Sequence, residues 1–166
     1  LYQNNDWENE YGLEYSSRKH NSRITNPNAS SFYLQNYLNV ERELSSVYGQ
    51  IAKVHRMEEG LQSWQVGARL SRVSANADNI DTSMAMMMPA AMSLRVSFNN
   101  ADKDLDYDLL DVVAKANLVI NDSLQIQGSL GRKEQAPMYS QLYTWFPLGI
   151  SAGLADGRNY LGNLNL

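Results

Sequence analysis

DVVAKANLVINDSLQIQGSLGRKEQAP, residues 111–137, contains two segments in which apolar and polar side chains alternate. In residues 124–131, Leu and Ile alternate with Gln and Ser; residues 111–120 repeat the pattern, with Val113 and Val119 as exceptions. A two-residue period is typical of a strand with one apolar and one polar face. Only Asn121-Asp122-Ser123 separates the segments, which predicts a tight antiparallel hairpin.

Composition limits the classes of protein. The 166 residues suffice for one domain with a sizeable core, and the net charge of −4 argues against a phosphate-binding or nucleic-acid-binding surface. The chain has no cysteine, which excludes disulfides, thiol catalysis and cysteine zinc sites. It opens without a charged-then-apolar signal peptide, and no apolar run approaches the roughly 18 residues of a membrane helix. A membrane β-barrel stays open, because its strands alternate.

The same period predicts further strands. They are expected at Trp7–Tyr15, Ser46–Arg56 and Ser63–Val73, with a sixth from Tyr160 to Leu166. Met92–Phe98 also alternates, as a strand or an ordered arm of a loop.

The expected connections alternate in length. Residues 15–46, 73–107 and 131–160 would be long loops, whereas residues 56–63 and 120–124 would be short turns. In an antiparallel up-and-down sheet, this pattern places every long loop at one end. The fold class predicted is therefore all-β, as a segment of a large transmembrane β-barrel with short periplasmic turns and long extracellular loops. A soluble β-sandwich or a lipocalin-like barrel remains the alternative, because periodicity does not distinguish a lipid-facing side from a core.

The last third of the chain adds a resemblance. It carries Arg132, Ala136-Pro137, Tyr143-Thr144-Trp145, the run Gly153–Arg158 and Tyr160–Asn163. These motifs resemble a segment of TonB-dependent outer-membrane receptors, with the copper- and siderophore-type receptors as the suggested branch. WQVGARLSRV (residues 64–73) and VYGQIAKV (residues 47–54) resemble earlier strands of that family more loosely.

The resemblance implies a fold and partners. It predicts that residues 1–166 form a partial β-barrel segment of about six strands, without the plug domain, signal peptide or energy-coupling box of such receptors. The implied function is uptake of a metal chelate across the outer membrane. Implied partners are outer-membrane lipid, the rest of the barrel, the plug, and the TonB complex acting through the plug; an isolated segment would self-associate. The alternative function is a soluble all-β binding module that uses long loops.

Two clusters are candidate sites. The first contains methionines whose thioether sulfur suits Cu(I), or which simply pack a loop: Met84, Met86, Met87, Met88 and Met92. No resident cofactor is expected, although copper or an iron chelate would be the cargo. The second comprises Tyr139, Tyr143, Trp145 and Arg158 as a ligand-binding surface, with packing of the last loop as the alternative reading of its aromatic side chains.

The aromatic residues near strand ends, an acidic run and the lack of enzyme motifs are less specific features. Trp7, Tyr11, Tyr15, Trp64 and Tyr107 near strand ends would form membrane-interface girdles, or a core in a soluble fold. The acidic run of residues 102–111 lacks the glycine and the closing glutamate of an EF-hand. We therefore expect a solvated loop and strand end there, not a calcium site. The lack of phosphate-loop, zincin and nucleophile-elbow motifs predicts that the chain is not an enzyme.

Overall fold

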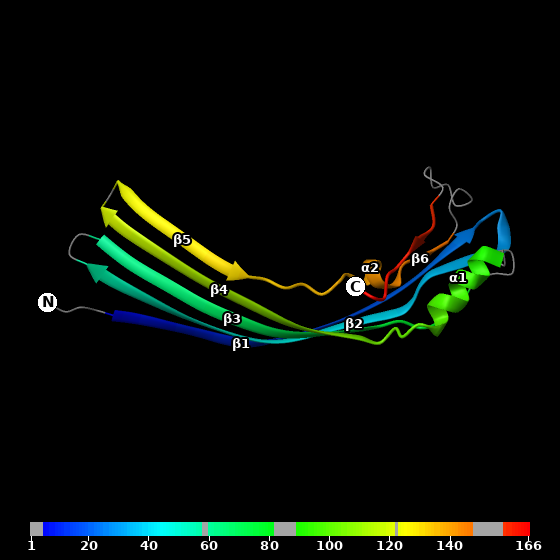
Figure 1. Cartoon of the computed structure of the whole chain (residues 1–166), viewed down its shortest axis with the longest axis horizontal. Helices are drawn as coiled ribbons and strands as arrows, with labels where there is room; N and C mark the ends of the chain where they lie inside the picture. The colour runs from blue at the N-terminus through cyan, green and yellow to red at the C-terminus, as the bar shows by residue number, and fades with distance from the viewer. Residues whose placement is uncertain (1–4, 58–59, 82–88, 122, 148–157) are drawn as a thin grey trace. The chain divides into compact units, whose positions relative to one another are not determined.

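A computed structural model describes residues 5–57, 60–81, 89–121, 123–147 and 158–166. These residues form five long strands, two helices and two short strands (Figure 1). The long strands make one sheet in the order β1-β2-β3-β4-β5, and the short strands β6 and β7 pair separately. The bounds are β1 Asn5–Asn26, β2 Ala29–Met57, β3 Gly60–Asn76, α1 Pro89–Asn100, β4 Leu105–Asn121, β5 Leu124–Arg132, α2 Tyr139–Tyr143, β6 Trp145–Phe146 and β7 Tyr160–Leu161.

The predicted hairpin of residues 111–131 is confirmed. β4 pairs with β5 in antiparallel register, with Leu118 opposite Ile126 and Asn117 opposite Gln127. Apolar residues therefore lie across from apolar residues, and polar from polar, as cross-strand packing favours. Ser123 N–H donates to Asn121 Oδ1 over 2.9 Å, which supports the tight turn.

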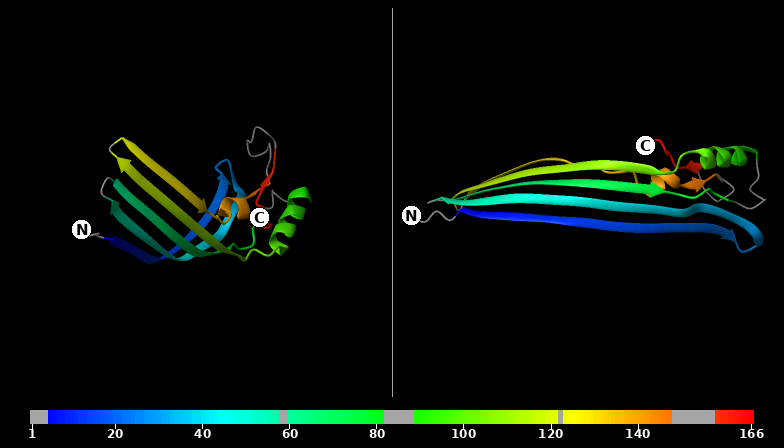
Figure 2. Two further views of the ribbon diagram at one scale, coloured as in Figure 1. Left: turned by 60° about the vertical axis from the view of Figure 1, so that its left-hand side comes forward. Right: turned by 90° about the horizontal axis from the view of Figure 1, so that it is seen from below.

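Neighbouring strands run in opposite directions, so the all-β, antiparallel prediction is confirmed (Figure 2). Among the described residues the sheet is open, with β1 and β5 at its edges.

The chain divides into two compact units. Unit 1 comprises residues 1–16, 44–73 and 107–136, and unit 2 comprises residues 17–43, 74–106 and 137–166. Unit 1 is sheet with few buried side chains, whereas unit 2 has a core of large apolar residues. The buried hydrophobic residues of unit 2 are Leu34, Val40, Ala75, Ile80, Phe98, Leu142, Tyr143 and Trp145.

The expected loop between residues 15 and 46 is wrong, because β1 and β2 continue through it to a tight turn. Asn28 N–H donates to Asn26 Oδ1 over 2.9 Å at this turn. Apart from Ile24, residues 17–26 of β1 are polar on both faces, so β1 carries no hydrophobic period there. In β2, Phe32, Leu34, Leu38 and Val40 do alternate with more polar residues, and Leu34 and Val40 are buried. Paired side chains bridge the two strands instead, as Lys19 does with Glu41.

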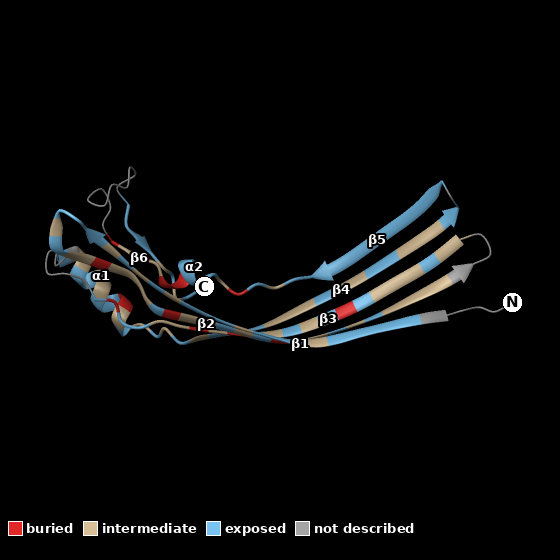
Figure 3. Ribbon diagram, turned by 180° about the vertical axis from the view of Figure 1, so that it is seen from behind, coloured by how far each residue is buried: buried red, intermediate tan, exposed pale blue. Residues whose placement is uncertain are grey.

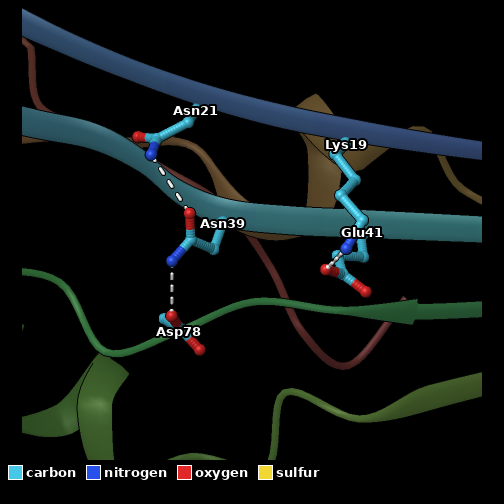
Figure 4. A network of polar contacts seen from close by, with 5 residues as sticks. All are labelled: Lys19, Asn21, Asn39, Glu41 and Asp78. Atoms are coloured by element: carbon cyan, nitrogen blue, oxygen red, sulfur yellow. Dashed lines mark hydrogen bonds and ion pairs between the residues drawn. The ribbon is translucent and has the colours of Figure 1, made fainter.

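Asn39 marks an irregularity in β2. Its backbone φ is 45°, a left-handed conformation that asparagine tolerates better than most residues. The Asn39 side chain accepts from Asn21 Nδ2 over 3.1 Å and donates to Asp78 Oδ2 over 2.7 Å (Figure 4). The strained residue is thus held by hydrogen bonds from both sides.

The expectation of a strand or loop arm at Met92–Phe98 is also wrong, since these residues lie in α1. Residues 91, 94, 95 and 98 are the less exposed ones, whereas 92, 93, 96 and 97 are exposed. That spacing is the helical one, and Pro89 stands at the first helical position, which proline favours. Met92 and Val96 are apolar but exposed, and they created the misleading alternation.

The predicted strand from Tyr160 does begin at that residue, but it ends at Leu161 and does not join the long sheet. Tyr160 pairs with Phe146 and Leu161 with Trp145 in a separate two-stranded sheet. Gly162 N–H donates to Thr144 O over 2.7 Å. A Cβ atom on Gly162 would lie 2.0 Å from Leu142 O, so only glycine fits this close approach.

Gly162→Ala is therefore expected to release residues 158–166 from unit 2. The added methyl group would meet backbone atoms, which cannot move as a flexible side chain can. Amide hydrogen exchange at Gly162 and Asn163 should rise to the rate of an unprotected segment. Leu164→Ala serves as the control in the same segment, and equal protection in both variants would contradict the expectation.

Candidate functional site

One face of unit 1 presents a continuous set of apolar side chains, here named the apolar band. Leu13 is 84% exposed and Leu130 is 80% exposed, although both are large and hydrophobic. Apolar surface of this extent usually marks an interface with a membrane or a partner. The band consists of Trp7, Tyr11, Leu13, Tyr15, Val47, Ile51, Trp64, Val66, Leu70, Val112, Leu118, Ile120, Leu124, Ile126 and Leu130.

Charged residues end the band at its far side. On β3 the next residue of the same face after Leu70 is Arg72, and on β4 Asp108 follows Leu110 on that face; the side chains of Arg72 and Asp108 approach to 4.0 Å. Arg132 follows Leu130 on β5. The band is therefore limited along the strands as well as confined to one face.

Aromatic rings and a cation lie at the opposite end of the band, near the tight turns. The Trp7 and Trp64 rings meet edge to face with centroids 5.5 Å apart. Lys53 Nζ lies 4.8 Å from the Trp7 ring centroid. Tryptophan beside a long basic side chain is a combination suited to a surface that is apolar on one side and wet on the other.

The other face of unit 1 carries a polar network. Gln65 Nε2 donates to Gln50 Oε1 over 2.5 Å, and Gln50 donates in turn to Glu10. In a second row, Arg69 Nη1 donates to Glu14 Oε2 over 3.0 Å. The predicted division of these strands into one apolar and one polar face is thus confirmed.

Tyr48 lies across the polar face. A Cβ atom on Gly12 would lie 2.6 Å from the Tyr48 ring, so the ring covers the glycine of the adjacent strand. The Arg69 guanidinium lies 5.3 Å from the same ring. Glycine in β1 therefore permits an aromatic ring to lie against the sheet.

Glu134 connects the segment that follows β5 to the neighbouring strand β4. Its carboxylate accepts from Leu110 N–H over 2.7 Å and from Arg132, while Glu134 N–H donates to Asp111 Oδ1 over 2.9 Å. The Leu110 N–H, followed by Arg132, holds the pKa of the Glu134 carboxyl below its ordinary value. A hydrogen bond to the charged form has this effect.

Acidification should weaken the hydrogen bonds that the Glu134 carboxylate accepts. Because the folded-state pKa is lowered, the stabilisation is present above the ordinary pKa of 4.5 and is lost as pH falls through the lower folded value. Protection of the Leu110 amide against hydrogen exchange should therefore fall in the parent chain as pH is lowered below 4.5. Glu134→Gln should already show the weaker protection at pH 7 and change little on acidification; an equal acid response in both would contradict the expectation.

The predicted ligand residues separate in the structure. Tyr143 is 0% exposed and Trp145 is 1% exposed, so both belong to the core of unit 2. Tyr143 Oη donates to Lys103 O over 2.8 Å, and the Trp145 ring lies 5.7 Å from that of Phe98. Arg158 is exposed. Burial favours packing over ligand contact for Tyr143 and Trp145.

Tyr139 belongs to an aromatic cluster that the sequence did not reveal. Its ring lies 5.1 Å from His20 and 5.5 Å from Tyr37, and His20 and Tyr37 lie 4.9 Å apart. Tyr37 Oη and Thr144 Oγ1 are hydrogen-bonded at 2.7 Å. No sequence signal links these residues, because they come from three distant segments. Tyr139 is 37% exposed, so this aromatic cluster reaches solvent.

No family model, no curated protein and no solved structure matches this chain. The geometry of the two units therefore carries the functional argument.

Within unit 2, α1 is fixed by polar contacts at its C-terminal end. Asn99 Oδ1 accepts from Ile80 N–H over 2.8 Å, and its amide donates to Ile80 O over 3.0 Å. Lys103 Nζ donates to the carbonyls of Asn99 and Ala101 over 2.9 and 3.0 Å. A cation at this position satisfies open carbonyls and complements the helix dipole.

The methionine site is only partly described. Met92 is 38% exposed on α1, whereas Met84, Met86, Met87 and Met88 lie outside the described residues. No group of three or more His, Asp or Glu side chains suited to a metal ion occurs in the described ranges. In the acidic run, Asp106 accepts from Ser74 over 2.6 Å, and residues 102, 104 and 108 are exposed.

No helix in the described ranges has the length and apolar character needed to cross a membrane.

Proposed function

We propose that this chain forms part of the wall of an outer-membrane β-barrel, in a TonB-dependent receptor that takes up a metal chelate of the siderophore or copper type. The observation that carries the barrel proposal is the exposed apolar band opposite a hydrogen-bonded polar face. Large apolar side chains on a sheet face are costly in water but favourable in hydrocarbon. The receptor assignment comes from the motifs of residues 131–166.

The dimensions of the apolar band support a lipid contact. From Trp7 to Tyr15, β1 rises roughly 27 Å at about 3.4 Å per residue. A strand tilt of about 40° reduces this to roughly 20 Å across the membrane, close to the apolar height of about 25 Å in such barrels. Trp7, Trp64 and Lys53 then belong at the interface on the tight-turn side, and Arg72 and Asp108 at the opposite interface.

Spin labelling tests the lipid contact directly. Because the chain lacks cysteine, single cysteines can be placed without background at Leu118 and Ile126, and at their neighbours Asn117 and Gln127 as matched controls. In vesicles, labels at Leu118 and Ile126 should be accessible to oxygen dissolved in lipid. Labels at Asn117 and Gln127 should be accessible to a water-soluble nickel reagent. Equal accessibility of neighbours, or no association with vesicles, would favour the soluble all-β binding module instead.

Transport requires a separate experiment in cells. Cells that lack the gene should take up less labelled ferric siderophore or copper chelate, and the intact gene should restore the uptake. Restoration should fail when the TonB complex is deleted or the proton gradient is dissipated. Restored uptake that is independent of TonB would exclude the receptor proposal while leaving the barrel proposal standing.

A further inference from the structure

An open groove of about 600 Å³ lies in the apolar band of unit 1, across strands β1 to β4. Its lining includes Leu13 on β1, Ser45 and Val47 on β2, and Leu70 on β3. Leu13 belongs to the largely exposed part of β1 (Figure 3). A volume of about 300–1,000 Å³ is typical of sites for small molecules. The groove therefore has the size of a site for one small molecule.

The short side chain of Ser45 accounts for the hollow. Ser45 is two residues from Val47, so both lie on the same face of β2. The small hydroxymethyl group leaves space between the exposed side chains of Leu13 and Leu70. Because β2 lies between β1 and β3 in the sheet, no peptide strand can add beside it to fill the space. The groove thus suits a flexible chain without backbone hydrogen-bonding groups.

Opposite charges also line the groove. They belong to Arg72 on β3 and Asp108 on β4, whose side chains are 58% and 80% exposed. Arg72 Nη1 lies 4.0 Å from Asp108 Oδ1, which is longer than a hydrogen bond. A guanidinium has five N–H donors and matches the geometry of a phosphate, whereas a carboxylate accepts from an ammonium. The pair therefore complements a head group that carries both signs of charge.

We propose that this groove binds one lipid whose head group carries a phosphate and an ammonium, as phosphoethanolamine does. The proposal rests on the lipid-facing position proposed for the apolar band and adds a specific site to it. The acyl chain lies against Leu13, Val47 and Leu70. The phosphate contacts Arg72, and the ammonium contacts Asp108. A zwitterionic head group is favoured over an anionic one, because a further negative charge would lie beside the Asp108 carboxylate without a cation of its own.

Photo-cross-linking tests the site with the full chain in phosphatidylglycerol vesicles. The probes are phosphatidylethanolamine and phosphatidylglycerol with the same photoreactive acyl chain, each at low mole fraction, and mass spectrometry locates the adducts. Adducts of the phosphatidylethanolamine probe should be at least fivefold more frequent at residues 45–47 and 70–72 than at residues 118 and 126. The latter two belong to the apolar band but lie outside the groove. The phosphatidylglycerol probe should label all these positions evenly.

Three variants separate the head group from the hollow. Asp108→Asn should remove the preference for phosphatidylethanolamine over phosphatidylglycerol, because the partner of the ammonium is lost. Ser45→Leu should abolish the concentration of adducts, because the larger side chain fills the hollow. Ala114→Leu is the control, since it adds a leucine on the same face, opposite Leu130, without lining the groove. This control should leave the distribution of adducts unchanged.

Even labelling of the apolar band by the phosphatidylethanolamine probe would indicate bulk lipid alone and would overturn the proposal. Equal concentration of both probes in the groove would overturn it too, as would an unchanged distribution in Ser45→Leu or an unchanged preference in Asp108→Asn. The spin labels at Leu118 and Asn117, measured in the same vesicles, test the barrel proposal separately. If they show lipid on one face while the adducts are even, only the specific lipid site is wrong.

Discussion

Arginine in place of Ile126 is expected to lower the free energy of unfolding in a bilayer by about 1–3 kcal/mol, between the costs of a cation on the lipid face at the midplane and near the interface of a barrel. Ile126 is 54% exposed and lies within the apolar band, opposite Leu118. In water, a charge at so exposed a position would change stability by only about 0.5 kcal/mol. Urea titration in vesicles, followed by tryptophan fluorescence, measures the difference.

Gln127→Arg provides the matched control. It introduces the same side chain one residue away, on the polar face, where Gln127 lies opposite Asn117. We expect a change within about 0.5 kcal/mol for this variant, because its cation stays in water. If both arginines cost the same amount, the two faces have the same environment and the lipid assignment of the apolar band is wrong.

The second large effect concerns unit 2. Trp145→Ala should destabilise this unit by about 3–5 kcal/mol, since a fully buried tryptophan leaves a large cavity. Met138→Ala removes a side chain that is 56% exposed and should cost about 0.5 kcal/mol or less. Loss of amide-exchange protection at Leu142 and Tyr143 reports the change.

A conservative substitution separates packing from ligand contact at the same position. Trp145→Phe keeps most of the ring volume, and the buried indole Nε1 has no hydrogen-bond partner in the described part of the chain. Uptake of the chelate should therefore persist in cells that carry Trp145→Phe. A loss of uptake without a loss of stability would restore Trp145 as a ligand residue.

The parts of the fold that were predicted are those with one apolar and one polar face. The hairpin from Asp111 to Gly131 and the strand from Ser63 to Val73 alternate strictly enough to specify type, register and face. Residues 17–26 of β1 are polar on both faces apart from Ile24, so the period is lost there, and the strand depends on pairs such as Lys19 with Glu41. In β2 the contrast is present at Phe32, Leu34, Leu38 and Val40, but Asn36 interrupts it and the strand was not recognised.

The candidate site was predicted less well, for two physical reasons. Helical residues 89–100 place Met92 and Val96 in solvent, which imitates a strand when read at a period of two. The aromatic cluster depends on tertiary contact between His20, Tyr37 and Tyr139, and spacing in the sequence says nothing of such contact.

The polar part of the β1–β2 hairpin has a consequence for how its register is maintained. Hydrophobic contrast normally prevents neighbouring strands from slipping, and residues 17–26 of β1 lack that contrast, although β2 retains it at residues such as Leu34 and Val40. Charged contacts between the two strands help to keep them in register there. Examples are Lys19 with Glu41, and Arg23 over the Tyr33 ring at 4.1 Å. Contacts of this exposed kind weaken as ionic strength rises. The alignment of the polar part of β1 is thus the one that dissolved salt should affect most, whereas the alignment of β4 with β5 depends on apolar side chains.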